Sequence, residues 1–200
     1  MLNAAGNIAR QVVSSHLRKN ASKYTSVKLV DARPFRKSVY NWQATLAPNL
    51  QVTKCLAKSV DSLNIELEGA QDVIYFTHDY VTMSSDKNSH LRAIAQLSAK
   101  HGNNLLAVCP IESEYAWSEE TEHDGSLKKF TQLVDEAQQA ALQSNPKMTL
   151  FKTNLTFGPE SHLIHFLAQC AIVGKAPYKI FASRDRLNFK YAPIHIDDVA

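Results

Sequence analysis

The chain has 200 residues, enough for one ordinary domain or for one domain and the beginning of a second. A hydrophobic share of 44% can supply a buried core, and a charged share of 20% argues against a disordered chain or a coiled coil. The net charge of +3 is spread along the sequence, so no basic stripe indicates binding to nucleic acid. No apolar run approaches the roughly 18 residues of a transmembrane segment. The three cysteines lack the C-x-x-C spacing of a zinc site, and we expect them to be buried and reduced.

Short β-rich runs alternate with amphipathic stretches along the chain. In chain order, the pattern predicts helix 7–19, strand 27–31, strand 52–57, helix 61–68, strand 72–77, helix 87–100, strand 105–109, helix 126–144, strand 148–153, helix 161–173 and strand 178–181. Residues 33–50 are interpreted as a long connection, and 113–125 as an acidic loop. Such alternation requires crossover connections, which predicts an α/β class, doubly wound and with a mainly parallel sheet.

The two ends of the sequence each suggest a missing part. A sheet of this type opens with a strand of about five residues, and only Met1 and Leu2 precede the first predicted turn. The last residues, 195–200, resemble the start of a helix. We therefore expect one nucleotide-binding domain over 1–200, truncated at both ends, with 175–200 starting a smaller C-terminal region.

A candidate phosphate-binding turn lies at residues 3–9, between the first strand and the first helix. Gly6 stands where the second glycine of a dinucleotide-binding turn lets the backbone approach the pyrophosphate. Ala9 occupies the place of the third glycine, and Asn3 that of the first. Asparagine is the non-glycine residue that best tolerates positive φ.

The end of the next strand adds a second candidate contact. Asp31 stands where an acidic side chain can bind the ribose of the adenosine. Arg33 and Arg36 follow closely and can instead hold a 2′-phosphate. The predicted cofactor-binding residues are Asn3, Gly6, Asn7, Ile8, Asp31, Arg33, Arg36 and Thr77.

Three further segments resemble one known family. Residues 67–74 (LEGAQDVI) resemble the entry to the fourth strand of extended short-chain dehydrogenases, and 156–159 (TFGP) and 191–200 (YAPIHIDDVA) resemble two of their later elements. The three segments follow one another in the same order as in that family, and with the turn at 3–9 they span nearly the whole chain. The sequence is therefore similar to the extended or atypical short-chain dehydrogenase/reductase superfamily with its Rossmann fold. Within that superfamily it most resembles the NAD(P)-binding accessory subunits of mitochondrial respiratory complex I.

The resemblance implies a nicotinamide cofactor and other protein subunits as partners. NADPH is favoured because Arg33 and Arg36 follow Asp31, with NADH or no cofactor as alternatives. The implied location is the matrix side of the mitochondrial inner membrane, the alternative being the cytoplasm. His162 and His165 share a helix face but lack a third ligand, so no metal site is predicted.

The catalytic residues of the family are not found where the resemblance places them. Its enzymes use a Tyr as general acid/base and a Lys four residues later, and on helix 126–144 these places fall to Lys128 and Gln132. Cys109 stands where the assisting Ser is expected, and Ser113 substitutes only loosely. The one literal Tyr-x-x-x-Lys, Tyr24 to Lys28, enters a strand and is interpreted as a coincidence.

Three functions follow from these features. The first is a non-catalytic accessory subunit without catalytic residues of its own. The second is an active NAD(P)-dependent reductase or epimerase with an unusual acid, Tyr115 or Tyr80. The third is a regulator that binds a dinucleotide and senses redox state.

Overall fold

The computed structural model confirms an α/β fold and describes residues 1–35, 47–77, 90–110, 125–153, 156–157, 172, 194–195 and 198. Its helices are α1 (Asn7–Asn20), the 3-10 turn η1 (Ala21–Lys23), α3 (Val60–Leu67), α5 (His90–His101) and α6 (Gly125–Ser144). Its strands are β1 (Ser26–Asp31), β2 (Gln51–Leu56), β3 (Asp72–Phe76), β4 (Asn104–Pro110), β5 (Thr149–Thr153), β6 (Thr156–Phe157) and β7 (Ile194–His195).

These elements confirm nine of the predicted ones, from helix 7–19 to strand 148–153, with the tested boundaries within one residue. The predicted start of helix 87–100 lies outside the described residues, which resume at His90. The predicted helix 161–173 and strand 178–181 lie outside the described residues, apart from Ile172, which is helical. The acidic stretch 113–125 also lies outside them, except for Gly125, the first residue of α6. The described parts of 33–50 contain no helix or strand, as predicted for a connection.

Local signals in the sequence explain where the helices begin and end. A reciprocal pair of hydrogen bonds between Ser59 and Ser62 caps the start of α3. Gly69 and Gly102 follow α3 and α5 with φ of 71° each, a conformation that side chains disfavour. Asn145, followed by a proline, ends α6.

Strands β1 to β5 form one parallel sheet around a central residue. β1 pairs with β2, β3 pairs with β4, and β4 pairs with β5, all in parallel. Leu2 forms parallel bridges to both Val30 of β1 and Tyr75 of β3, and so joins the two groups of strands. The spatial order is therefore β2-β1-Leu2-β3-β4-β5, which is the 3-2-1-4-5-6 order of a Rossmann fold when Leu2 is counted as the first strand.

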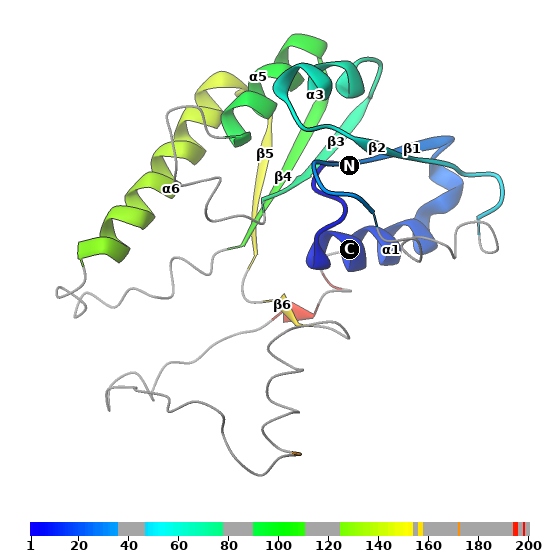
Figure 1. Cartoon of the computed structure of the whole chain (residues 1–200), viewed down its shortest axis with the longest axis horizontal. Helices are drawn as coiled ribbons and strands as arrows, with labels where there is room; N and C mark the ends of the chain where they lie inside the picture. Colours follow the sequence, from blue (N-terminus) through cyan, green and yellow to red (C-terminus); the bar gives the residue numbers. More distant parts are fainter. Residues whose placement is uncertain are drawn as a thin grey trace.

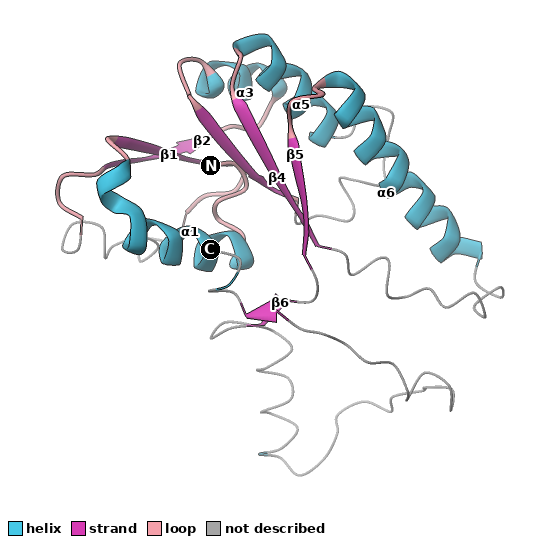
Figure 2. Ribbon diagram, turned by 180° about the vertical axis from the view of Figure 1, so that it is seen from behind, coloured by secondary structure: helices cyan, strands magenta, loops and turns pink. Residues whose placement is uncertain are grey.

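Helices cover both faces of this sheet (Figures 1 and 2). On one face α1 packs with Val13 and Leu17 on Leu29 and Phe76 of the strands. On the other face lie α3, α5 and α6, whose buried side chains include Leu67, Leu91, Ile94 and Ala141. Burying a leucine or phenylalanine side chain contributes roughly 1.5–3 kcal/mol, so the two apolar layers hold the central strands between them.

A small second sheet joins two of the segments that resemble the dehydrogenase family. β6 and β7 pair in parallel, with Thr156 opposite Ile194 and Phe157 opposite His195. The described parts of the two sequence motifs, residues 156–157 and 194–195, thus meet in space. Among the described helices, none is both long and apolar enough to cross a membrane.

Candidate functional site

The predicted turn lies at the carboxyl edge of the sheet, between Leu2 and α1. Asn3 adopts a φ of 58°, which confirms the positive φ expected of it. Its side-chain Nδ2 donates to the carbonyl of Phe76 over 2.8 Å, and the amide of Ala4 donates to Val30 over 3.2 Å. The turn is therefore tied to the strands on both of its sides.

Asp31 connects this turn to the end of β1. Its Oδ2 accepts the backbone amide of Ala5 over 3.0 Å, and its Oδ1 accepts the amide of Arg33 over 2.8 Å. The Arg33 guanidinium adds Nε to Oδ1 at 3.1 Å and Nη2 to Oδ2 at 3.3 Å. The Asp31 side chain is only 1% exposed, whereas that of Arg33 is 54% exposed. The carboxylate therefore links the turn to the end of β1, and the arginine faces the solvent beside the turn.

The contact from Ala5 was not predicted. Every residue type has a backbone amide, and the sequence has no signal for where this one points. Asp31 was predicted to bind a ribose directly. That contact stays a prediction. Both oxygens of Asp31 accept hydrogen bonds from the protein, which leaves fewer lone pairs for a ligand hydroxyl.

The start of α1 supplies the remaining part of the candidate site. The helix begins at Asn7 with Gly6 as its N-cap, and no side chain caps it. Its first turn has no acidic residue. The free amides and the positive end of the helix dipole favour an anion at this point. The side chains of Asn7 and Ile8 lie outside the described residues.

Thr77 and Cys109 lie at the same carboxyl edge, after β3 and within β4. The Thr77 hydroxyl is buried and donates to the carbonyl of Val108 over 3.0 Å. Cys109 is 1% exposed, and burial raises the pKa of its thiol despite a hydrogen bond with Thr77. A raised pKa leaves little thiolate at neutral pH, so Cys109 is a poor nucleophile. The prediction that Cys109 is buried is confirmed. Cys55 is only partly buried, and Cys170 lies outside the described residues.

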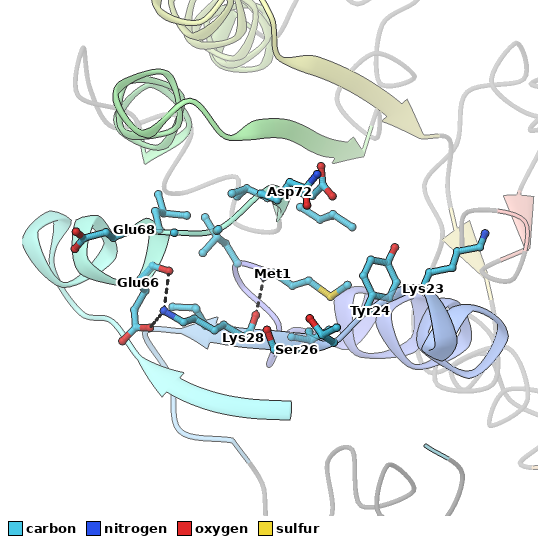
Figure 3. Close-up of a pocket in the computed structure, with 18 residues that line it drawn as sticks. Met1, Lys23, Tyr24, Ser26, Lys28, Glu66, Glu68 and Asp72 are labelled. Atoms are coloured by element: carbon cyan, nitrogen blue, oxygen red, sulfur yellow. Dashed lines mark hydrogen bonds and ion pairs between the residues drawn. The ribbon is translucent and has the colours of Figure 1, made fainter. Parts of the chain in front are cut away.

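The interpretation of Tyr24 and Lys28 as a coincidental motif agrees with their positions at the amino end of β1. The Tyr24 hydroxyl meets Nε2 of His16 at 2.8 Å, and the Lys28 ammonium lies 3.5 Å from a carboxylate oxygen of Glu66. Both line a cavity of about 330 Å³ at the amino ends of β1 and β3, opposite the predicted turn (Figure 3). This pair therefore lies far from the candidate site.

Other predicted residues fall outside the described part of the chain. Arg36, Tyr80, Ser113 and Tyr115 are among them, as are His162 and His165. Lys128 and Gln132 lie on α6 as predicted, but their side chains are outside the description. Among the described residues, no group of three or more metal-ligating side chains comes together.

Solved structures of short-chain dehydrogenases/reductases have a similar fold. One is a wide-type member from Veillonella parvula in complex with NADP, with a TM-score of 0.57 and 15% identity over 99% of this chain and 81% of that one. Another is vestitone reductase from alfalfa (Medicago sativa), with a TM-score of 0.59 and 14% identity over 99% and 68% of the two chains. Comparisons with protein-family models and with curated proteins find no match. At these identities the likeness establishes a shared fold.

The stability of the turn is expected to depend on Asn3 in two separable ways. Asn3→Ala removes the hydrogen bond to Phe76, which contributes about 0.5–1.5 kcal/mol. It also places alanine in a left-handed conformation, which costs roughly 1–2 kcal/mol. Asn3→Gly removes only the hydrogen bond. Denaturant unfolding should therefore rank the free energies of unfolding as wild type, then glycine, then alanine. Equal values for the two variants would show that the positive φ carries no cost.

Proposed function

We propose that this chain binds a nicotinamide dinucleotide at the carboxyl edge of its sheet, with NADPH preferred over NADH. The observation that carries the proposal is the junction at Asp31, which joins the turn before α1 to an exposed arginine at the end of β1. The shared fold supports it, since the Veillonella parvula protein of that fold is described in complex with NADP.

The parts of the site match the parts of a dinucleotide. The uncapped start of α1 suits the pyrophosphate, because its free amides point outward from the helix end. Gly6 places no side chain over those amides. The adenosine end would then lie across the end of β1, where Asp31 and Arg33 stand.

The state of Asp31 favours the phosphorylated cofactor. An NADH ribose needs a carboxylate with oxygens to spare, and both oxygens of Asp31 accept hydrogen bonds from protein donors. A 2′-phosphate instead needs an exposed guanidinium, and more than half of the Arg33 side chain is exposed. The buried carboxylate holds this guanidinium in place.

Replacing Arg33 is expected to change the choice of cofactor. In Arg33→Ala the dissociation constant for NADPH should rise by about 10-fold to 100-fold, since a hydrogen bond to a charged group contributes roughly 1.5–3 kcal/mol. The constant for NADH should change much less. Titration calorimetry with both cofactors measures the ratio, which is insensitive to a general loss of stability.

Lys19→Ala is the matched control, because Lys19 is a cation in the last turn of α1, at the other end of the helix. It should leave both constants unchanged. Equal weakening of NADPH and NADH by Arg33→Ala would contradict a phosphate contact. Unchanged NADPH binding would contradict the site itself.

Two uses of the bound cofactor remain open to experiment. The fold favours an active reductase, because vestitone reductase has a similar fold and is named for a reductase activity. A non-catalytic accessory subunit of a mitochondrial respiratory complex is favoured by the sequence motifs and by Lys128 and Gln132 on α6. Neither solved protein is described as an accessory subunit, so that role and the matrix location rest on the motifs alone.

We expect the purified chain to show no turnover of NADPH with carbonyl or sugar-nucleotide substrates. Lys128 and Gln132 stand where the resemblance places the tyrosine that gives a proton to the carbonyl oxygen and the lysine that lowers its pKa, so the pair that protonates the substrate is absent. The buried thiol of Cys109 does not replace a serine hydroxyl. Loss of a positioned acid or base typically lowers the rate by about 10²–10⁴.

Steady-state absorbance assays over a panel of substrates measure this directly. The double variant Lys128→Tyr with Gln132→Lys should also be inactive, because the serine is absent as well. Turnover by the unaltered chain that is lost in Tyr115→Phe or Tyr80→Phe, with dinucleotide binding retained, would establish the reductase.

A further inference from the structure

The hydrogen-bonded ladder between β1 and β2 continues past the last paired residues of the two strands. Asp31 lies opposite Leu56, and the next amide of the β2 chain, that of Ala57, donates to the carbonyl of Asp31 over 3.0 Å. Continuing the same register places Lys58 beside Arg33 at the carboxyl edge of the sheet. A second cation therefore lies next to the exposed arginine of the candidate site.

Lys58 and Asp31 belong to the same face of the sheet. Val52 of β2 packs into the apolar layer that contains α1, whereas Ala57 packs into the opposite layer. The N-cap residue of α3, which follows Lys58, is extended with a φ of −136°. By the alternation of an extended chain, Lys58 points to the side of α1. Asp31 points there as well, since it accepts the amide of Ala5 in the turn before α1.

The charge of Lys58 is not neutralised by the protein in the part of the chain that the structure describes. The lysine is exposed, and no described residue forms a hydrogen bond or an ion pair with its ammonium. Asp61, in the first turn of α3, is exposed too and makes no ion pair with it there. The oxygens of Asp31 are already bonded to Arg33 and to backbone amides. Asp31 therefore balances only one of the two cations.

Two exposed cations side by side suit an anion with two charges. They repel each other while the site is empty, and an anion bound between them replaces this repulsion by two attractions. A phosphate monoester carries about −1.5 to −2 charges at pH 7 and has three acceptor oxygens. It can therefore accept charge-assisted hydrogen bonds from a guanidinium and an ammonium at once. A ribose hydroxyl has no charge and gains little from the second cation.

We propose that Lys58 is the second cation of the cofactor site and determines, together with Arg33, the preference for a 2′-phosphate. The inference rests on the proposed function, because it assigns a further residue to the adenosine end of the same nucleotide. Arg33 is held by Asp31 and presents a fixed fork, whereas Lys58 presents a point charge on a flexible stem. The phosphate would thus bridge the carboxyl ends of β1 and β2.

Titration calorimetry on the whole chain tests this with 2′,5′-ADP and 5′-AMP, which differ only in the 2′-phosphate. In Lys58→Gln the dissociation constant for 2′,5′-ADP should rise by about tenfold, the low end for a hydrogen bond to a charged group, because the lysine is exposed and screened. The constant for 5′-AMP should be unchanged. Lys58→Arg keeps the charge and should retain most of the discrimination.

Lys54→Gln is the matched control. Lys54 is an exposed lysine on the same strand and the same face, but it pairs with Leu29, well back from the carboxyl edge. The variant removes the same charge from the protein and should leave both constants unchanged. A general loss of stability in any variant would weaken both nucleotides and so cannot imitate the expected result.

The outcomes separate this inference from the proposed function. Loss of 2′,5′-ADP affinity in Arg33→Ala but not in Lys58→Gln would overturn the role of Lys58 and leave the cofactor site standing. Equal weakening of both nucleotides in Lys58→Gln would also overturn it, since the lysine would then contact the part that they share. An equal effect of Lys54→Gln would do the same. If the unaltered chain binds neither nucleotide, the proposed function fails and this inference with it.

Discussion

The backbone of Leu2 joins the two halves of the sheet, and the position of the candidate site depends on this junction. Its amide donates to Ile74 over 2.7 Å, and its carbonyl accepts from Phe76 over 3.3 Å. The preceding carbonyl, that of Met1, accepts from Val30 of β1 over 2.8 Å. These three bonds align the carboxyl ends of β1 and β3. The turn that starts at Asn3 must therefore emerge between them, at the point where the strand order reverses and open α/β sheets bind ligands.

The electrostatics of the site follow from one buried carboxylate. Burying a charge is costly unless it is paired and hydrogen-bonded, and Asp31 meets both conditions through Arg33 and the amide of Ala5. These hydrogen bonds offset the cost of desolvating the charge only while the turn and the end of β1 keep their geometry. Asp31 therefore couples the backbone that would face a pyrophosphate to the cation that would face a 2′-phosphate.

The periodicity of the sequence was sufficient to predict most of the described fold. Alternating strand and helix patterns located β1 to β5 and their helices, because the helices bury one face in an apolar layer and β1, β3 and β4 bury residues on both faces. The positive φ of Asn3 was predictable, because few residue types tolerate that conformation. Gly69 and Gly102 were predictable as helix ends for the same reason.

The contacts within the site could not be predicted in this way. Sequence position placed Asp31 at the end of a strand, but not its bonds to Ala5 and Arg33, which depend on how two distant segments meet. Leu2 is another example, because a single extended residue has no periodicity and its role appears only from its two partners. Sequence patterns report which face of an element is buried, whereas a binding site depends on pairings between elements.

The turn before α1 is fixed from both sides by strand ends that Leu2 aligns. The side chain of Asn3 donates to the carbonyl of Phe76 at the end of β3, and Asp31 at the end of β1 accepts the amide of Ala5. Because Leu2 bridges β1 and β3, its pairing sets the separation of these two strand ends. The geometry of the candidate site therefore depends on one residue in the centre of the sheet as well as on the residues that line the site.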